Sequence, residues 1–158
     1  MTREQRSCDK FSLCRNDTVV YQFRDCVGAE DPFLFVRGDD WWIESWAYRD
    51  AEDSSARSAP TRGFQVVVNG QLLSDAYHCS ETFDYHYVGD RPFFLFCRDN
   101  TLGWNYCGVE TVSDFDEFFH GHCCELATSD PLFCANGFSF YARRNDLWYL
   151  VAGRIVQP

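Results

Sequence analysis

The stretch that decides the fold is FLFVRGDDWW, from Phe33 to Trp42. It returns in altered form as FLFCRDNTLGW at Phe94–Trp104 and as FYARRNDLW at Phe140–Trp148. Each copy has apolar residues, then an Arg beside Asp or Asn, then a Trp. Gly, Asp and Asn tolerate positive φ, and Asp and Asn also bond the nearby backbone, so these residues favour tight turns. The sequence therefore predicts the same β-hairpin in three copies.

Three arginines and three tryptophans anchor these copies: Arg37 with Trp42, Arg98 with Trp104, and Arg143 with Trp148. Two Asn-Gly dipeptides, Asn69-Gly70 and Asn136-Gly137, predict two more hairpins, because Asn-Gly is the strongest short-range signal of a type I′ turn. Further strands are predicted at 18–23 and at 82–88, where large and polar residues alternate in the second segment.

Length and composition favour one strand-rich domain. At 158 residues the chain suits a single domain, 1–158, with one core. Aromatic residues make up 18% of the chain, which favours strands over helices. The polar stretch 51–63 has no periodicity and is typical of a linker. We therefore expect repeat-like units at about 18–50, 64–109 and 123–153.

The three hairpin copies are unevenly spaced, since Arg98 lies closer in sequence to Arg143 than to Arg37. A propeller or a solenoid would need a steadier period. We predict an all-β fold, an irregular antiparallel sandwich or barrel of degenerate hairpin repeats. A β-trefoil is the alternative.

One segment, near 112–122, predicts a short helix instead. Ser113 can cap it, acidic residues follow at the positive end of the helix dipole, and three phenylalanines fall on one face. These are Phe115, Phe118 and Phe119.

The third copy belongs to a longer pattern, PLFCANGFSFYARRNDLWYL, at Pro131–Leu150. This order of Pro, aromatic residue, Gly turn, aromatic strand and Trp resembles the short W-x-I β-repeat modules of large protist and algal proteins, which run G-R-P-x-Y, Gly, Y-L-Y, W-x-I. GDRPFFLF at 89–96 and DPFLFVRGDDWWI at 31–43 look like further copies. The second copy departs from the pattern, because Tyr106 stands where it has an aliphatic residue. The resemblance implies an interaction or scaffold role and no catalytic residues.

The charge of the chain limits its partners. The formal net charge is −10, with Lys10 the only lysine, and such a surface repels the phosphates of nucleic acid. No run reaches the roughly 20 apolar residues of a membrane helix, and the first residues lack the apolar segment of a secretory signal. We expect a soluble protein without a transmembrane segment, in the cytosol or in an organelle lumen after removal of a targeting peptide.

Aromatic residues on the predicted strands are the candidate binding residues. Trp42, Trp46 and Tyr48 share one face of a strand, which is either core or an exposed strip. An exposed strip beside Asp and Glu suits a protein interface or a sugar-binding groove. Trp104 and Trp148, at the other two hairpins, complete the candidate set.

Cysteine and histidine are the candidate metal ligands. His120, His122, Cys123 and Cys124 lie within HGHCCE and offer imidazoles and thiolates for zinc. The segment has no C-x-x-C spacing, so buried thiols or disulfides are the alternative. The chain has 9 cysteines, an odd number, so they cannot all pair within it. The disulfide candidates are Cys8, Cys14, Cys26 and Cys134, with free thiols as the alternative.

The sequence shows no nucleophile signature, P-loop or dinucleotide fingerprint, so we expect no enzyme and no cofactor other than zinc. The expected function is a non-catalytic interaction or scaffold protein, a small peripheral subunit that docks on a larger protein complex through aromatic faces. The alternatives are a carbohydrate-binding module with a glycan ligand and a zinc-stabilised small domain.

Overall fold

The computed structural model describes residues 9–25, 32–48, 62–119 and 131–155. The chain divides into two compact units, Met1–Ala76 (unit 1) and Tyr77–Pro158 (unit 2). This division differs from the single unit expected from the sequence. Its boundary falls after a short helix rather than in the expected linker, of which 51–61 lie outside the described residues.

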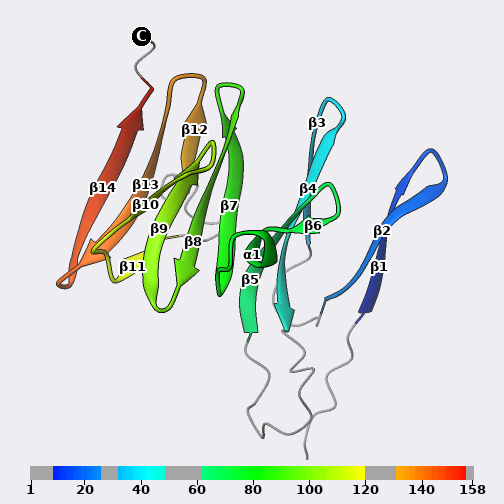
Figure 1. Cartoon of the computed structure of the whole chain (residues 1–158), viewed down its shortest axis with the longest axis horizontal. Helices are drawn as coiled ribbons and strands as arrows, with labels where there is room; N and C mark the ends of the chain where they lie inside the picture. Colours follow the sequence, from blue (N-terminus) through cyan, green and yellow to red (C-terminus); the bar gives the residue numbers. More distant parts are fainter. Residues whose placement is uncertain (1–8, 26–31, 49–61, 120–130, 156–158) are drawn as a thin grey trace, which may run out of the picture. The chain divides into compact units, whose positions relative to one another are not determined.

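The described residues of unit 1 form one hairpin and one four-stranded antiparallel sheet (Figure 1). The hairpin pairs β1 with β2, and the sheet has the order β3-β4-β5-β6. A four-residue helix, α1, follows β6. Apolar side chains from β4, β5 and α1 are buried, which places the core against this sheet. The bounds are β1 Asp9–Arg15, β2 Thr18–Asp25, β3 Phe33–Arg37, β4 Asp40–Tyr48, β5 Arg62–Val68, β6 Gln71–Leu72 and α1 Leu73–Ala76.

In unit 2, the strands within the described ranges form two four-stranded antiparallel sheets. The first has the order β10-β9-β8-β7, and in the second β13 pairs along its whole length with β14 and, on its other side, with β11 and then β12. The bounds are β7 Glu81–Val88, β8 Arg91–Arg98, β9 Thr101–Tyr106, β10 Val109–Val112, β11 Glu117–Phe118, β12 Leu132–Cys134, β13 Gly137–Arg144 and β14 Leu147–Arg154.

Aromatic rings hold the two sheets of unit 2 together. Phe93 of β8 lies 4.4 Å from Phe138 of β13, measured between ring centroids, and Trp104 lies 5.8 Å from Phe140. Phe93 and Phe140 are buried, at 0% and 1% exposed. The sheets therefore form a sandwich with an aromatic core, and the predicted all-β sandwich is confirmed. The described residues contain no closed barrel, so a trefoil does not fit.

All three predicted hairpins of the repeated phrase are confirmed. Two-residue turns join β3 to β4 at Gly38-Asp39, β8 to β9 at Asp99-Asn100, and β13 to β14 at Asn145-Asp146. Except for Asp39, these turn residues have positive φ, which Gly, Asn and Asp tolerate. The sequence therefore specifies these chain reversals locally.

The two Asn-Gly hairpins are also present, one of them with a shifted turn. Asn69-Gly70 joins β5 to β6 with positive φ at both residues, as predicted. The other turn consists of Ala135-Asn136, and Gly137 is instead the first residue of β13. A Cβ atom on Gly137 would lie 2.4 Å from the Gly153 carbonyl oxygen, so this glycine permits close packing rather than a turn.

The register of the hairpins changes one of the predicted anchors. Arg37 and Arg98 each immediately precede a turn, but in the third hairpin that position belongs to Arg144 rather than Arg143. A fourth hairpin of the same kind joins β1 to β2, with Arg15 before the turn Asn16-Asp17. The RNDT of 15–18 closely matches the RDNT of 98–101, a signal that the three-copy interpretation overlooked.

The helix predicted near 112–122 is wrong for its described part. Residues 113–119 contain the short strand β11, and residues 120–122 lie outside the described residues. Their backbone bonds are long-range: Ser113 N donates to Leu102 O, and Asp116 N to Arg143 O. The acidic side chains bind the β13–β14 turn instead of a helix end, because Asp114 pairs with Arg144 at 2.6 Å and Asp116 accepts a hydrogen bond from Asn145 N.

Candidate interaction surface

The outer face of the β12-β13-β14 sheet gathers exposed apolar side chains. Alternate residues of β13, including Phe138 and Phe140, face the aromatic core, so Ser139, Tyr141 and Arg143 face outward. Residues paired across antiparallel strands share a face, which also places Trp148 and Leu150 of β14 and Leu132 of β12 on the outside. We call this surface the outer face; it consists of Phe119, Leu132, Cys134, Ser139, Tyr141, Trp148, Leu150 and Ala152.

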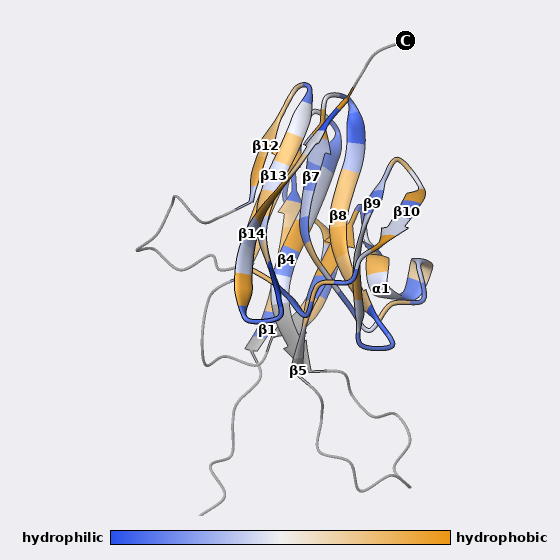
Figure 2. Ribbon diagram, turned by 90° about the vertical axis from the view of Figure 1, so that its left-hand side faces the viewer, coloured by the Kyte–Doolittle hydropathy of each residue, from blue (hydrophilic) through white to orange (hydrophobic). Residues whose placement is uncertain are grey.

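Three large apolar residues of the outer face are well exposed. Leu132 is 60% exposed, Leu150 61% and Trp148 48%, although all three lie within strands. Figure 2 shows apolar stretches along β12 and β13 in this unit. Exposed apolar residues scattered singly are ordinary, but a set gathered on one face is typical of a binding surface.

A half-exposed tryptophan forms one end of the outer face. The Trp148 ring meets Phe119 edge-on, 6.1 Å between centroids, and the Arg143 guanidinium carbon lies 6.0 Å from the Trp148 ring centroid. Arg143 is in turn paired with Glu117 at 2.7 Å. Tryptophan and arginine are both enriched among the residues that contribute most to protein–protein binding.

A shallow concavity of about 540 Å³ lies at the other end of the β12-β13-β14 sheet. Gly137 contributes to it and has no side chain to fill the space. Leu132 and Ala152 add apolar surface, while Ser139 and Arg154 add polar groups, so the concavity could receive an apolar side chain with a polar neighbour.

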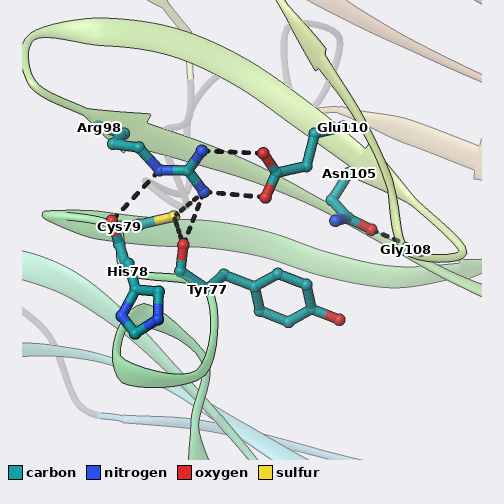
Figure 3. Close-up of polar contacts among 7 residues, drawn as sticks. All are labelled: Tyr77, His78, Cys79, Arg98, Asn105, Gly108 and Glu110. Atoms are coloured by element: carbon teal, nitrogen blue, oxygen red, sulfur yellow. Dashed lines mark hydrogen bonds and ion pairs between the residues drawn. The ribbon is translucent and has the colours of Figure 1, made fainter.

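A polar cluster around Arg98 fixes the loop before β7 (Figure 3). The Nη1 and Nη2 atoms of Arg98 each lie 2.8 Å from a carboxylate oxygen of Glu110 on β10, a bidentate arrangement. Nη2 also donates to the Tyr77 carbonyl at 2.6 Å, and Nε donates to the His78 carbonyl at 3.2 Å. The side chain therefore joins the hairpin of β8 and β9 to both β10 and the loop before β7.

Electrostatics around Arg98 follow from these contacts. The hydrogen bonds from Arg98 lower the pKa of the Glu110 carboxyl below its ordinary value of 4.5, while the hydrogen bond from Arg98 to Glu110 raises the pKa of Arg98. Burial raises the pKa of the Cys79 thiol, and Arg98, 3.5 Å from its sulfur, opposes this only in part. Cys79 is 5% exposed, so it is a buried thiol rather than an accessible nucleophile.

Asn105 stabilises the neighbouring turn. It is 1% exposed, and its Oδ1 accepts a hydrogen bond from Gly108 N at 2.9 Å (Figure 3). This contact fixes the turn Cys107-Gly108 between β9 and β10, both residues of which have positive φ. Glu110, two residues further on, is thereby held where Arg98 can reach it.

The structure describes the side chains of three of the five predicted aromatic binding residues, Trp42, Trp104 and Trp148. Trp42 is 5% exposed and stacks on Phe35 at 5.2 Å, so it belongs to the core and cannot offer its ring to a sugar. The side chains of Trp46 and Tyr48 lie outside the described residues, and Trp104 is half-buried against Phe138 and Phe140. Among the predicted aromatics whose side chains are described, Trp148 alone is exposed.

The predicted metal ligands and two of the disulfide candidates lie outside the described part of the chain. These are His120, His122, Cys123, Cys124, Cys8 and Cys26. Within the described ranges, no group of three or more His, Cys, Asp and Glu side chains is placed to hold a metal ion. Cys14 and Cys134 are exposed free thiols, which for these two residues agrees with the free-thiol alternative.

Unit 1 has a smaller apolar cavity. It has a volume of about 290 Å³ and is lined mainly by Leu13, Val20, Leu34, Val36 and Trp41, from both of the unit's sheets. The Arg15–Asp39 ion pair, 2.6 Å long, links the β1–β2 turn to the β3–β4 turn beside it. Both partners are more than half exposed, so this pair adds little to stability.

Comparisons with protein-family models, with curated proteins and with solved structures found no match. In the described residues, no helix is long and apolar enough to span a membrane.

Proposed function

We propose that the protein is a non-catalytic interaction protein, a small subunit that docks on a larger protein assembly through the outer face of unit 2. The observation that carries this proposal is the cluster of Leu132, Trp148 and Leu150, each about half exposed or more on one sheet face. A partner that covers this face would bury its apolar surface, and each Å² buried contributes about 25 cal/mol of favourable free energy. Trp148, flanked by Arg143, is its proposed anchor.

The chemistry around the face suits a protein partner. Charged groups near Trp148 are already paired, since Arg143 binds Glu117 and Arg144 binds Asp114. A partner surface would therefore meet apolar side chains and satisfied charges, which lowers the desolvation cost of binding. The formal net charge of the whole chain, −10, favours a partner with a basic rim around its apolar contact.

The test is affinity capture with the full chain and matched variants. Leu132→Asp introduces a charge into the face, whereas Val109→Asp introduces the same charge at a residue 69% exposed on β10, in the other sheet of unit 2. The wild type and Val109→Asp should capture the same partners from the source organism. Leu132→Asp should capture about tenfold less of them, or less still, which corresponds to a loss of about 1.4 kcal/mol of binding free energy. Equal capture by both variants, quantified by mass spectrometry, would reject this face.

A further inference from the structure

Strand β14 is a long edge strand without the usual protection against pairing. In the part of the chain that the structure describes, β13 is the one strand that pairs with it. Natural edge strands are commonly short, bulged, or interrupted by charge or proline. The eight residues of β14 pair with β13 without a register shift, and the first seven, LWYLVAG, contain neither a charge nor a proline.

The other edge strands of the two units are protected. In unit 2, β10 has four residues, one of which is Glu110, β11 and β12 have two and three residues, and the register of β7 against β8 is irregular between Phe83 and His86. In unit 1, β6 has two residues and β3 has five, ending in Arg37. The β1–β2 hairpin has a register shift between Leu13 and Cys14, and both of its strands carry charged residues. Among the described strands, β14 is thus the edge best able to accept another strand.

The direction of the free backbone groups can be derived from the pairing. Ile155 N donates to Asn136 O, on the β13 side, and amides alternate in direction along a strand. The amides of Gly153, Val151 and Tyr149 therefore also face β13. The amide and carbonyl groups that face away from β13 belong to Trp148, Leu150, Ala152 and Arg154.

We propose that β14 pairs antiparallel with β14 of a second copy of this chain, so that the sheets of two unit 2 sandwiches continue into one. The strand is self-complementary, because its first four residues, LWYL, are large, the next three, VAG, are smaller, and the last is an arginine. A two-fold axis at Val151 places Leu150 beside Ala152 of the second copy, and Trp148 beside Arg154 of the second copy. On the outer face this pairs a large side chain with a small one and a cation with an aromatic ring.

The pairing satisfies the free backbone groups of both copies. With the axis at Val151, the outward groups of Leu150 meet those of Ala152, and the outward groups of Trp148 meet those of Arg154. No acidic side chain lies within either β14, so the strands meet without like-charge repulsion despite the −10 charge of each chain. One strand on each side is a small interface, so we expect monomer and dimer to exchange with concentration.

The inference deepens the proposed function, because the same sheet carries both surfaces, and two substitutions separate them. Ala152→Pro removes an amide that faces the free edge, so it should prevent strand pairing while the β13–β14 bonds remain. Leu132 lies on β12, on the opposite side of β13, so Leu132→Asp should leave the dimer intact. A failed partner capture with an intact dimer would therefore reject only the proposed function.

The experiment is sedimentation of the purified full chain under reducing conditions, up to about 1 mM. We expect the mass to rise from 18.4 kDa towards twice that value, and the rise to be absent with Ala152→Pro. Leu150→Lys, which puts a charge on the edge, should abolish the rise as well and serves if the proline variant does not fold. A wild-type monomer at every concentration, or a dimer that both variants retain, would overturn the inference.

Amide exchange followed by NMR gives a second, residue-specific readout. The amides of Trp148, Leu150, Ala152 and Arg154 should gain protection as the concentration rises, whereas those of Tyr149, Val151 and Gly153 should be protected throughout. If the first set exchanges equally fast at low and high concentration, β14 does not pair, and any dimer uses another surface.

Discussion

Arg98 makes contacts that sequence proximity gives no reason to expect. It reaches the carbonyls of Tyr77 and His78, about twenty residues earlier, and Glu110, twelve residues later. The turn before which it stands was predictable from Asp and Asn, which act on their own backbone. Its partners were not, because they depend on how β7 and β9 flank β8 and on how β10 pairs with β9.

Replacing Arg98 tests this cluster. Arg98→Gln should lower the free energy of unfolding by about 1–3 kcal/mol, since it removes a bidentate charge pair and leaves two carbonyls without their donor. Arg144→Gln is the matched control, because Arg144 also precedes a hairpin turn and pairs with an acidic residue, but that residue is 72% exposed. Urea titration should show the smaller loss for Arg144→Gln, and an equal loss would contradict the structural role of Arg98.

The stability of unit 2 should also depend on pH through Glu110. Its pKa is lower in the folded chain than its ordinary value of 4.5, so the folded state favours the ionised carboxylate. The resulting stabilisation is fully present above pH 4.5 and is lost as the pH falls through the lower, folded value. The difference in unfolding free energy between wild type and Arg98→Gln should therefore shrink in acid. A difference that is constant between neutral pH and acid would exclude this linkage.

The tryptophans show a different limit of sequence reasoning. A period of two along a strand separates two faces but does not say which is buried. Trp42 is buried because Phe35, its cross-strand partner, stacks on it, whereas Trp148 pairs with Arg143 on the outside of a sheet. The exposed aromatic residue could be identified only after the sheets were placed face to face.

At the scale of elements, the hairpins were predictable and the helix was not. Each predicted hairpin turns within two residues, so its whole signal is local. The 113–119 segment carries helix-like spacing, but its backbone bonds and its acidic side chains are used by Leu102, Arg143, Arg144 and Asn145. Tertiary pairing thus outweighs a short amphipathic pattern, because isolated helices shorter than about 12–15 residues are only marginally stable in water.

Close packing inside the β13–β14 hairpin depends on Gly153. A Cβ atom at this position would lie 2.3 Å from Cζ of the Phe138 ring, which itself packs in the core. Gly153→Ala should therefore destabilise unit 2 by about 1–3 kcal/mol through overpacking. Ala152→Ser, on the exposed face beside it, is the control and should change stability by less than about 0.5 kcal/mol. Thermal unfolding of both variants tests this prediction, and similar unfolding midpoints for Gly153→Ala and Ala152→Ser would contradict the close contact with Phe138.

At the scale of the whole molecule, the boundary between the units was hidden in the sequence. Composition pointed to the polar stretch 51–63, yet the units divide after Ala76, just before the loop that Arg98 holds. The contacts of Tyr77 explain this, since its ring lies 4.9 Å from Phe94 and its carbonyl binds Arg98, both in unit 2. A boundary set by such contacts leaves no mark in local composition.

The fragment Tyr77–Pro158 should fold on its own. Its described aromatic core is internal, since the rings of Phe93, Phe118, Phe138 and Phe140 contact partners within the unit. We expect a cooperative thermal transition and a dispersed amide spectrum from the isolated fragment. The same fragment carrying Phe140→Ala, which opens a cavity at a residue 1% exposed, should lose both. A fragment that is unfolded without the substitution would show that unit 2 needs the rest of the chain.

The two-residue turns also bear on how the chain finds its structure. Strands joined in this way meet neighbours that are close in sequence, so each ribbon can close within about 1–10 μs, before any sheet is complete. Joining β12 to β7 and β11 to β13 instead requires segments tens of residues apart to meet. The formation of these long-range pairings should set the folding rate of unit 2. Until they form, the hairpins expose their aromatic faces, which can associate with other chains.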